Sequence, residues 1–223
     1  YQRHTYRYYP GTLPKKGENE GGEAYRADWD ENSFSWETTA GYKFEKNDHS
    51  LDVLGGFSAY RFASHDFNLS GSGYMDDAIM WNNMNSVLDK ETYSAGTSYS
   101  KKTKMSVYAR LNYNWKSRYY LTVTGRYDGA SNFAANNKGA FVPSAAFKWN
   151  LANENFLKNC RWIDDLSIRM SAGLTGNDAI STYRSLATLS STTGGYLFAG
   201  SQPVAFYRSR LDSPDLTWEK TAA

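Results

Sequence analysis

The feature of this sequence that most constrains its fold is an alternation of apolar and polar residues between Thr103 and Thr175. Four segments of about ten residues each repeat the alternation with a period of two. Side chains of a β-strand point in turn to opposite faces of a sheet, so each segment is predicted to be a strand with one apolar and one polar face. The four segments are 105–115, 119–128, 141–151 and 166–175.

The length of these segments favours a membrane β-barrel. Strands of soluble proteins usually have about five or six residues, whereas a tilted strand that crosses a bilayer needs about nine to eleven. Aromatic residues also gather at the ends of the apolar faces, as in the aromatic girdles of outer-membrane barrels: Tyr113, Trp115, Tyr119, Phe141, Phe147 and Trp149. The alternative is a large soluble β-sandwich with one solvated face.

The polar faces carry charged side chains that suit a wet lumen and not a packed core. These residues, predicted to face the lumen, are Arg110, Arg126, Asp128, Lys148 and Arg169.

Two further strands are predicted before these four, at 34–44 and 51–62, which gives six in all. Long polar loops are expected at 1–32, 63–102 and 176–216, and the alternation restarts at 217–221. The connections at 46–49 and 116–118 are short. Outer-membrane barrels have short periplasmic turns and long extracellular loops, so the order of loop lengths also favours a barrel. A short helix capped by Asn153 is expected in the connection 152–165.

Composition excludes several classes of protein. The 223 residues carry a net charge of +2, which does not favour nucleic acid as a partner. The sequence contains no apolar run of the length that a transmembrane helix needs. Cys160 is the single cysteine, so neither an internal disulfide nor a cysteine metal site is predicted. The chain begins at Tyr1 without a signal peptide, and we expect it to be an internal part of a longer exported protein.

No motif in the sequence predicts an enzyme, a cofactor or a metal site. Gly173–Asp178 lacks the Gly-Lys-Ser/Thr ending of a phosphate-binding loop and is interpreted as the exit of a strand into a loop. The pairs Asp76–Asp77 and Asp164–Asp165 lack the spacing of a calcium loop. The three histidines have no metal-ligand spacing, and no nucleophile stands in a G-x-S-x-G context.

Several ordered motifs resemble the barrel of SusC/RagA-type TonB-linked outer-membrane proteins. They read ARLNYNW at Ala109–Trp115, RYYLTVTGRYDGASNF at Arg118–Phe133, FVPSAAFKW at Phe141–Trp149, LSIRMSAGLTGND at Leu166–Asp178, and SPDLTWEKT at Ser213–Thr221. The resemblance covers roughly residues 103–221. It implies an antiparallel transmembrane β-barrel of about 22 strands with a plugged lumen, of which residues 1–223 would form part of a single barrel domain.

The resemblance also implies the function and the partners. A protein of this family imports glycan fragments or oligopeptides across the outer membrane of a Bacteroidetes-like Gram-negative cell. It acts with a SusD-like surface lipoprotein and with the TonB complex. The plug domain, the signal peptide and the C-terminal strands are expected outside this sequence. A siderophore receptor, a passive porin and a soluble carbohydrate-binding module are the alternative functions.

Candidate substrate-binding residues lie in the predicted long loops. Aromatic rings stack on sugars and arginines donate hydrogen bonds, and loops on a rigid scaffold commonly carry binding residues. The candidates are Trp81, Tyr183, Tyr196, Phe198, Phe206, Tyr207, Arg208 and Arg210.

Overall fold

The computed structural model describes residues 1–10, 22–74, 76–87, 90–157, 162–193, 200 and 204–223. These residues form ten strands and four short 3-10 helices, with no α-helix among them. None of the helices described is long and apolar enough to cross a membrane. The strands are β1 (Gln2–Tyr9), β2 (Gly22–Lys46), β3 (His49–Tyr74), β4 (Ser94–Trp115), β5 (Tyr119–Ala130), β6 (Gly139–Asn150), β7 (Ser167–Asn177), β8 (Thr188–Thr193), β9 (Val204–Arg210) and β10 (Glu219–Ala222).

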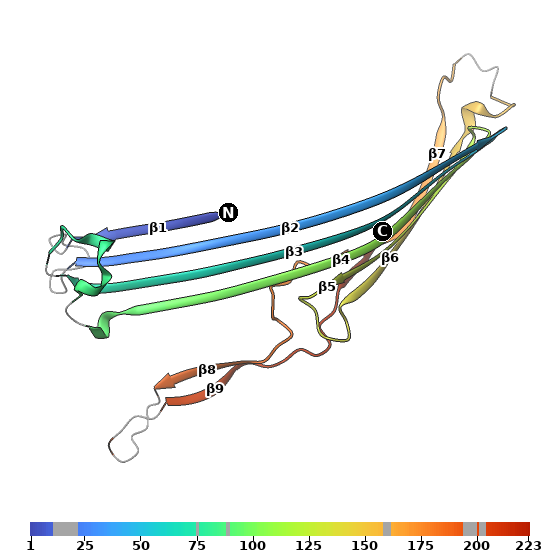
Figure 1. Ribbon diagram of the computed structural model, residues 1–223. Helices are drawn as coiled ribbons and strands as arrows, with labels where there is room; N and C mark the ends of the chain where they lie inside the picture. The colour runs from blue at the N-terminus through green and yellow to red at the C-terminus, as the bar shows by residue number, and fades with distance from the viewer. Residues whose placement is uncertain (11–21, 75, 88–89, 158–161, 194–199, 201–203) are drawn as a thin grey trace. The chain divides into compact units, whose positions relative to one another are not determined.

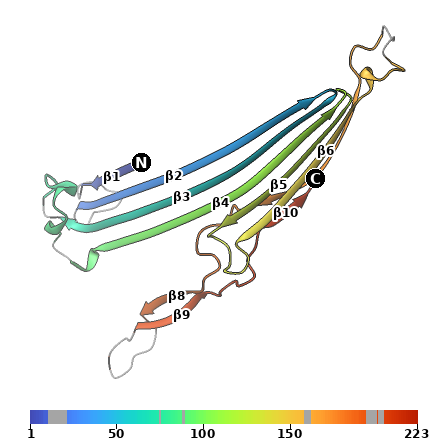
Figure 2. The same cartoon turned by 45° about the vertical axis from the view of Figure 1, so that its right-hand side comes forward.

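Eight of these strands form one sheet in the order β1-β2-β3-β4-β5-β6-β7-β10, and β8 pairs with β9 alone (Figures 1 and 2). The pairings of β4 with β5, β5 with β6 and β6 with β7 are all antiparallel. The chain divides into two compact units, each described here by itself. The first contains residues 1–34 and 61–101, and the second contains residues 35–60 and 102–223.

The register of the second unit confirms that the predicted alternation sorts side chains onto two faces. In the apolar rows, Phe147 lies opposite both Leu121 and Met170. In the polar rows, Lys148 lies opposite both Tyr120 and Arg169. A shift of one residue in any strand would mix the two faces, so the apolar pattern is what fixes this register.

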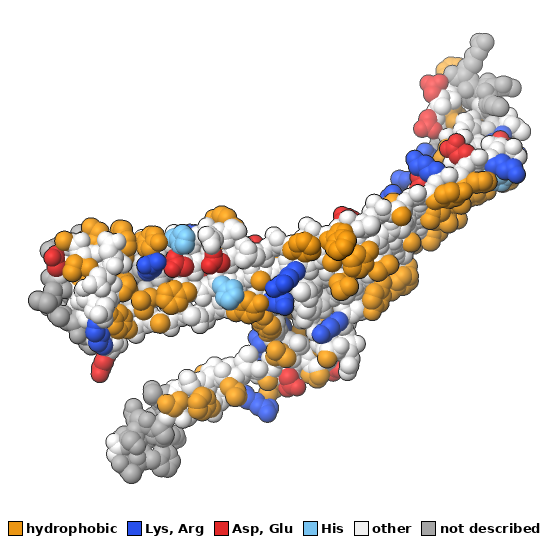
Figure 3. Space-filling view, in the orientation of Figure 1, with side chains coloured by type: hydrophobic (Ala, Val, Ile, Leu, Met, Phe, Trp, Pro, Cys, Tyr) orange, Lys and Arg blue, Asp and Glu red, His pale blue; other side chains and the backbone are white. Residues whose placement is uncertain are grey.

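Many of the apolar side chains remain exposed. Met170 is 63% exposed and Val107 is 58% exposed, although both lie within strands. Figure 3 shows hydrophobic side chains gathered over the part of the sheet that contains β5 and β6. An apolar band of this kind is typical of a surface that contacts lipid or another protein.

The predicted turns at 46–49 and 116–118 are confirmed, but two of the predicted long loops are partly wrong. Residues 1–32 contain β1 and the beginning of β2, and residues 63–102 contain the end of β3 and the beginning of β4. As a result β2, β3 and β4 have 25, 26 and 22 residues, about twice the predicted length. The ladder hydrogen bonds of a strand do not require one face to be apolar, so alternation does not reveal such extensions.

Two smaller predictions also fail. The helix expected at Asn153 is only a 3-10 turn, η4 (Leu151–Asn153), and Glu154 returns to an extended backbone. Asn153 donates its side-chain N–H to the carbonyl oxygen of Ser117 at 2.7 Å instead of capping a helix. The loop predicted at 176–216 contains the β8–β9 hairpin, which projects away from β5 and β6 in both views (Figures 1 and 2).

Each unit has a small buried core. In the first unit Ala24, Tyr74 and Val87 are buried, beside the short helices η1 (Met80–Asn82), η2 (Met84–Ser86) and η3 (Lys90–Thr92). In the second unit the buried residues are Ala130, Phe133, Ala140 and Trp218. Among the described residues, both cores lie where strands meet the long connections.

Candidate functional site

The polar face of β4–β7 is the candidate functional surface. The register places even-numbered residues of β4, β5 and β6 on the same face as odd-numbered residues of β7. This face therefore collects five charged residues that the sequence predicts to face a lumen: Arg110, Arg126, Asp128, Lys148 and Arg169. Their position on the wall of a lumen stays a prediction.

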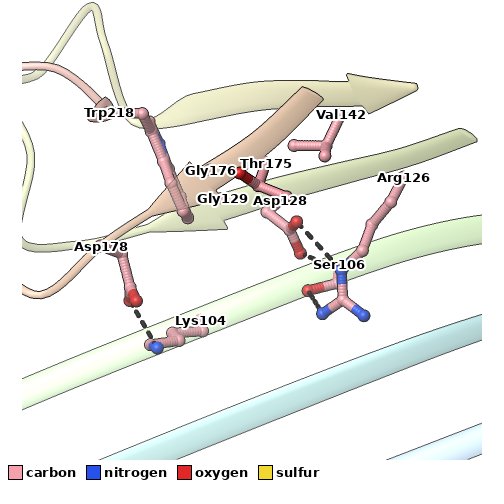
Figure 4. A pocket seen from close by; sticks show the side chains of 10 residues that line it. All are labelled: Lys104, Ser106, Arg126, Asp128, Gly129, Val142, Thr175, Gly176, Asp178 and Trp218. Atoms are coloured by element: carbon pink, nitrogen blue, oxygen red, sulfur yellow. Dashed lines mark hydrogen bonds and ion pairs between the residues drawn. The ribbon is translucent and has the colours of Figure 1, made fainter. Parts of the chain in front are cut away.

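A first pocket, which we call the loop-end pocket, lies where β4–β7 meet the long connections (Figure 4). It has a volume of about 350 Å³, and its polar and aromatic lining consists of Lys104, Ser106, Arg126, Asp128, Thr175, Asp178 and Trp218.

Arg126 is held firmly in the loop-end pocket. Its Nε donates to both carboxylate oxygens of Asp128, at 2.7 and 3.0 Å, and its Nη2 donates to Ser106 Oγ at 3.0 Å. A guanidinium that is fixed by a carboxylate and a hydroxyl keeps one orientation. The remaining N–H groups of Arg126 can donate to a ligand without rearrangement of the wall.

Asp178 is the second carboxylate of the loop-end pocket. Lys102 Nζ lies 3.0 Å from Asp178 Oδ2, and Lys104 contacts the same oxygen. Burial disfavours the charged form of Asp178, but the hydrogen bonds and charges of the two lysines outweigh it and lower the pKa of the carboxyl. The two lysines therefore favour the ionised carboxylate of Asp178 over the neutral acid.

Trp218 forms the apolar wall of the loop-end pocket. Its ring stacks on Phe133 with ring centroids 4.8 Å apart, and its Nε1 donates to the carbonyl oxygen of Lys138 at 3.0 Å. The apolar ring of the indole is thereby packed against Phe133, and its N–H group has a hydrogen-bond acceptor. The motif SPDLTWEKT thus closes the pocket by inserting its tryptophan beside β7.

A second pocket, which we call the turn-end pocket, lies on the same polar face near the short turns. It also has a volume of about 350 Å³. Its polar lining comprises Ser50, Asp52, Asn112, Asn114, Tyr120, Thr122, Lys148 and Arg169.

A network centred on Glu154 stabilises the sheet beyond the turn-end pocket. Its Oε1 accepts hydrogen bonds from Tyr119 Oη at 2.6 Å and Trp149 Nε1 at 3.1 Å, and its Oε2 accepts one from Arg118 at 3.0 Å. The hydrogen bonds from Tyr119 and Trp149 lower the pKa of the Glu154 carboxyl, and the charge of Arg118 lowers it further. Glu154 is buried, so this network ties the connection after β6 to the aromatic row formed by Trp115, Tyr119 and Trp149.

The substrate-binding candidates predicted from the sequence lie in different environments. Phe206, Tyr207 and Arg208 lie exposed on β9, where Phe206 is 73% exposed. The guanidinium of Arg210 donates hydrogen bonds to the carbonyl oxygens of Tyr183 and Leu186, so this side chain is already bound to the protein's own backbone.

Trp81 belongs to the first unit, where its ring stacks on Tyr6 with ring centroids 6.0 Å apart. Tyr196 and Phe198 lie outside the described residues. The substrate-binding role of all these residues stays a prediction.

Five residues of the polar and aromatic lining of the loop-end pocket were not among the sequence candidates: Lys104, Ser106, Thr175, Asp178 and Trp218. Lys104 and Ser106 continue the even-numbered polar positions of β4, so the alternation already carried a signal for them. Asp178 and Trp218 come from connections whose paths the alternation does not predict. Among the described residues, no group of three or more His, Cys, Asp or Glu side chains could hold a metal ion.

Comparison with known proteins identifies the class. The family described as "TonB dependent receptor-like, beta-barrel" matches residues 1–222. TonB-dependent receptor P26 of Formosa agariphila is 33% identical over 203 residues, which are 91% of this chain and 20% of that protein. TonB-dependent receptor SusC of Bacteroides thetaiotaomicron is 35% identical over 129 residues, which are 56% of this chain and 13% of that protein.

The fold agrees with a solved structure of the same kind. The structure of the RagAB peptide transporter superimposes with a TM-score of 0.86 at 25% sequence identity. The match covers 99% of this chain and 24% of the RagAB chain.

The chain therefore belongs to the TonB-dependent receptor-like β-barrel family, and the predicted resemblance to SusC and RagA is confirmed. It spans about a quarter or less of the length of these relatives. The antiparallel barrel prediction is confirmed, and the soluble-sandwich alternative is set aside.

Proposed function

We propose that this chain forms part of the wall of an outer-membrane, TonB-dependent nutrient importer of the SusC/RagA type. The observation that carries the proposal is the division of β4–β7 into an exposed apolar face and a charged, pocketed polar face. A barrel in lipid needs an apolar exterior and leaves its interior free to be polar. Residues 1–223 are proposed to belong to one barrel domain, with the plug and the segment that engages TonB elsewhere in the protein.

The proposed cargo is a glycan fragment or an oligopeptide. Both have hydrogen-bonding groups and apolar surfaces, which match the fixed Arg126 and the Trp218 ring of the loop-end pocket. The name of the RagAB transporter gives peptide as the cargo of that protein. A siderophore receptor would use the same wall for a metal chelate and is the second candidate.

The proposed partner at the cell surface is a SusD-like lipoprotein, and the proposed docking element is the β8–β9 hairpin. A hairpin of two strands is marginally stable by itself in water. This hairpin nevertheless exposes Leu189, Val204 and Phe206, which are 68%, 55% and 73% exposed. The register places these three side chains on one face, because Phe206 lies opposite Ser191 and Val204 lies opposite Thr193.

Purification of the full-length receptor from outer-membrane vesicles in detergent tests this proposal. We expect a surface lipoprotein to co-purify and proteoliposomes to take up labelled glycans or peptides when coupled to TonB. A protein that is soluble without detergent would contradict the proposal. A barrel that takes up only ferric chelates, with no lipoprotein bound, would support the siderophore-receptor alternative.

A further inference from the structure

The connection from β6 to β7 lies against the aromatic row at the turn end of the sheet. Its described residues are 151–157 and 162–166, which we call the β6–β7 connection. Glu154 Oε1 accepts hydrogen bonds from Tyr119 Oη at 2.6 Å and from Trp149 Nε1 at 3.1 Å. In a membrane girdle these ring groups donate to lipid headgroups and water. At β5 and β6 the carboxylate of Glu154 therefore takes the position of a headgroup.

The two rings that bind Glu154 belong to the apolar face of the sheet. Tyr119 and Trp149 are register partners, and the next row on the same face pairs Leu121 with Phe147. Residues two apart in a strand point to the same side. The β6–β7 connection thus contacts the sheet through side chains of its apolar face and not through the polar face that carries the two pockets.

Hydrogen bonds hold the β6–β7 connection in this position. The N–H group of Leu151 donates to the carbonyl oxygen of Leu166 at 2.8 Å, which closes the connection at its two ends. Near its start, Arg118 donates to Glu154 Oε2 at 3.0 Å and to Asn155 Oδ1 at 3.1 Å. The beginning and the end of the connection are therefore fixed beside the aromatic row, as a docking surface requires.

Two large apolar side chains of the β6–β7 connection are exposed. Phe156 is 70% exposed and Trp162 is 94% exposed. Phe156 follows Glu154 by two residues, so their α-carbons are at most about 7 Å apart. The headgroup layer of a bilayer is roughly 5–8 Å thick on each side. A ring at that distance from the aromatic row remains within the headgroup layer, where aromatic side chains bind favourably.

The charges beside these rings favour a zwitterionic lipid. Asp164 and Asp165 are exposed, and among the described residues no cationic nitrogen lies within 4 Å of either carboxylate. Carboxylates are repelled by anionic lipids and attracted by the ammonium group of a zwitterionic headgroup. Lys116 Nζ lies 5.3 Å from the centroid of the Trp115 ring in the aromatic row, where a lysine binds headgroup phosphate.

We infer that the β6–β7 connection docks on the headgroup layer of zwitterionic phospholipids, with the rings of Phe156 and Trp162 inserted between the lipids. The inference rests on the proposed function, since only a wall in a membrane has headgroups beside its turns. It goes beyond that function because the polar groups of Tyr119 and Trp149 are bound to Glu154 and leave this contact to the connection. The connection thus extends the lipid contact of the protein beyond the ends of β6 and β7.

A fluorescent label beside the two rings tests the inference in the full-length receptor. A nitrobenzoxadiazole label is attached to Asn155→Cys in a receptor that also carries Cys160→Ser. The receptor is reconstituted in vesicles of phosphatidylethanolamine and phosphatidylcholine, some of whose headgroups carry a nitroxide quencher. We expect the lipid nitroxide to quench the label. The variant Phe156→Ser/Trp162→Ser should lose roughly half of this quenching or more, because it removes the inserted apolar area.

Two further variants sharpen the test. The matched control Leu189→Ser/Phe206→Ser removes side chains of similar exposure, 68% and 73%, from the β8–β9 hairpin and should leave the quenching unchanged. In vesicles of phosphatidylglycerol the wild-type label should be quenched less, and Asp164→Asn/Asp165→Asn should restore the quenching.

Equal quenching with and without the rings of Phe156 and Trp162 would overturn the inference, since the wall alone would then bring the label to the headgroups. A wild-type label that is quenched by aqueous iodide and not by the lipid nitroxide would also overturn it and would favour a protein partner. A heat-dependent shift on gels shows that each variant is folded, and Trp162→Ser alone, with a smaller loss expected, replaces a double variant that does not fold.

Labels on the apolar face of β7, such as at Met170, test the membrane wall separately. If those labels contact the bilayer while the label at residue 155 does not, the inference fails and the proposed function stands. If neither contacts the bilayer, the proposed function fails and the inference fails with it.

Discussion

The two pockets of the polar face have similar volumes but opposite states of charge compensation. In the loop-end pocket, each cation lies against a carboxylate of the same wall: Arg126 against Asp128, and Lys104 against Asp178. In the turn-end pocket, Lys148 and Arg169 lie against each other. The difference teaches that the alternation places cations along the whole polar face, whereas only one end of that face also supplies carboxylates that pair with them.

The largest expected effect on stability is at Trp218, which forms the apolar wall of the loop-end pocket. Trp218→Ala removes a buried ring that stacks on Phe133, and we expect it to destabilise the barrel by about 3–5 kcal/mol. Denaturant unfolding of the full-length receptor in detergent, followed by heat-shift gels, measures the loss. A change below about 1 kcal/mol would mean that the pocket wall does not depend on the indole.

The second prediction compares the two pockets directly. Asp128→Asn leaves Arg126 without its anion and should cost about 1 kcal/mol, a modest value because Arg126 is 46% exposed. Lys148→Gln removes one of two like charges on paired positions and should leave the free energy of unfolding unchanged or slightly higher. Equal losses of stability in the two variants would erase the contrast between the pockets.

The third prediction concerns pH. The folded-state pKa of Asp178 is lowered, so its contribution to stability is fully present above the unfolded value of about 3.9. That contribution is lost as the pH falls through the lower folded-state pKa. The unfolding temperature of the wild type should therefore drop more steeply below pH 4 than that of Asp178→Asn. Parallel curves for the two proteins would show that Lys102 and Lys104 do not stabilise the ionised form.

The smallest effect on stability is expected in the β8–β9 hairpin. Phe206 is 73% exposed, so Phe206→Ser should change the free energy of unfolding by no more than about 0.5 kcal/mol. The same change should reduce the amount of surface lipoprotein that co-purifies. Thr192→Ala, on the opposite face of the hairpin, is the matched control. Full retention of the lipoprotein by Phe206→Ser would remove the hairpin from the proposed interface.

The sequence predicts the part of the fold in which apolar and polar residues alternate regularly. In the pairings of β5 with β6 and β6 with β7, each position that the alternation predicts to be apolar lies opposite another such position, and these strands have 12, 12 and 11 residues, close to the predicted length. The extensions of β2, β3 and β4 escape prediction because those parts of the sequence do not alternate cleanly between apolar and polar residues. The β8–β9 hairpin escapes because its strands, of 6 and 7 residues, are shorter than the segments of about ten residues on which the prediction was based.

The candidate site was predicted only in part. Arg126, Asp128, Lys148 and Arg169 follow from the alternation, and the structure adds which of them are paired. Asp178 and Trp218 reach the loop-end pocket from connections whose course depends on tertiary packing, such as the stacking of Trp218 on Phe133. The stabilising role of Glu154 depends on the approach of Tyr119 and Trp149, which its local sequence does not show.

The most direct test of the central claim is a spin-label scan along β7 of the full-length receptor in lipid vesicles, with Cys160 replaced by serine. Labels at Ile168, Met170 and Ala172 should be relaxed by oxygen dissolved in the bilayer. Labels at Ser167, Arg169 and Ser171 should be relaxed instead by a water-soluble nickel complex, giving a period of two. Equal access of the nickel complex to both sets would contradict the claim that this wall separates lipid from a polar lumen.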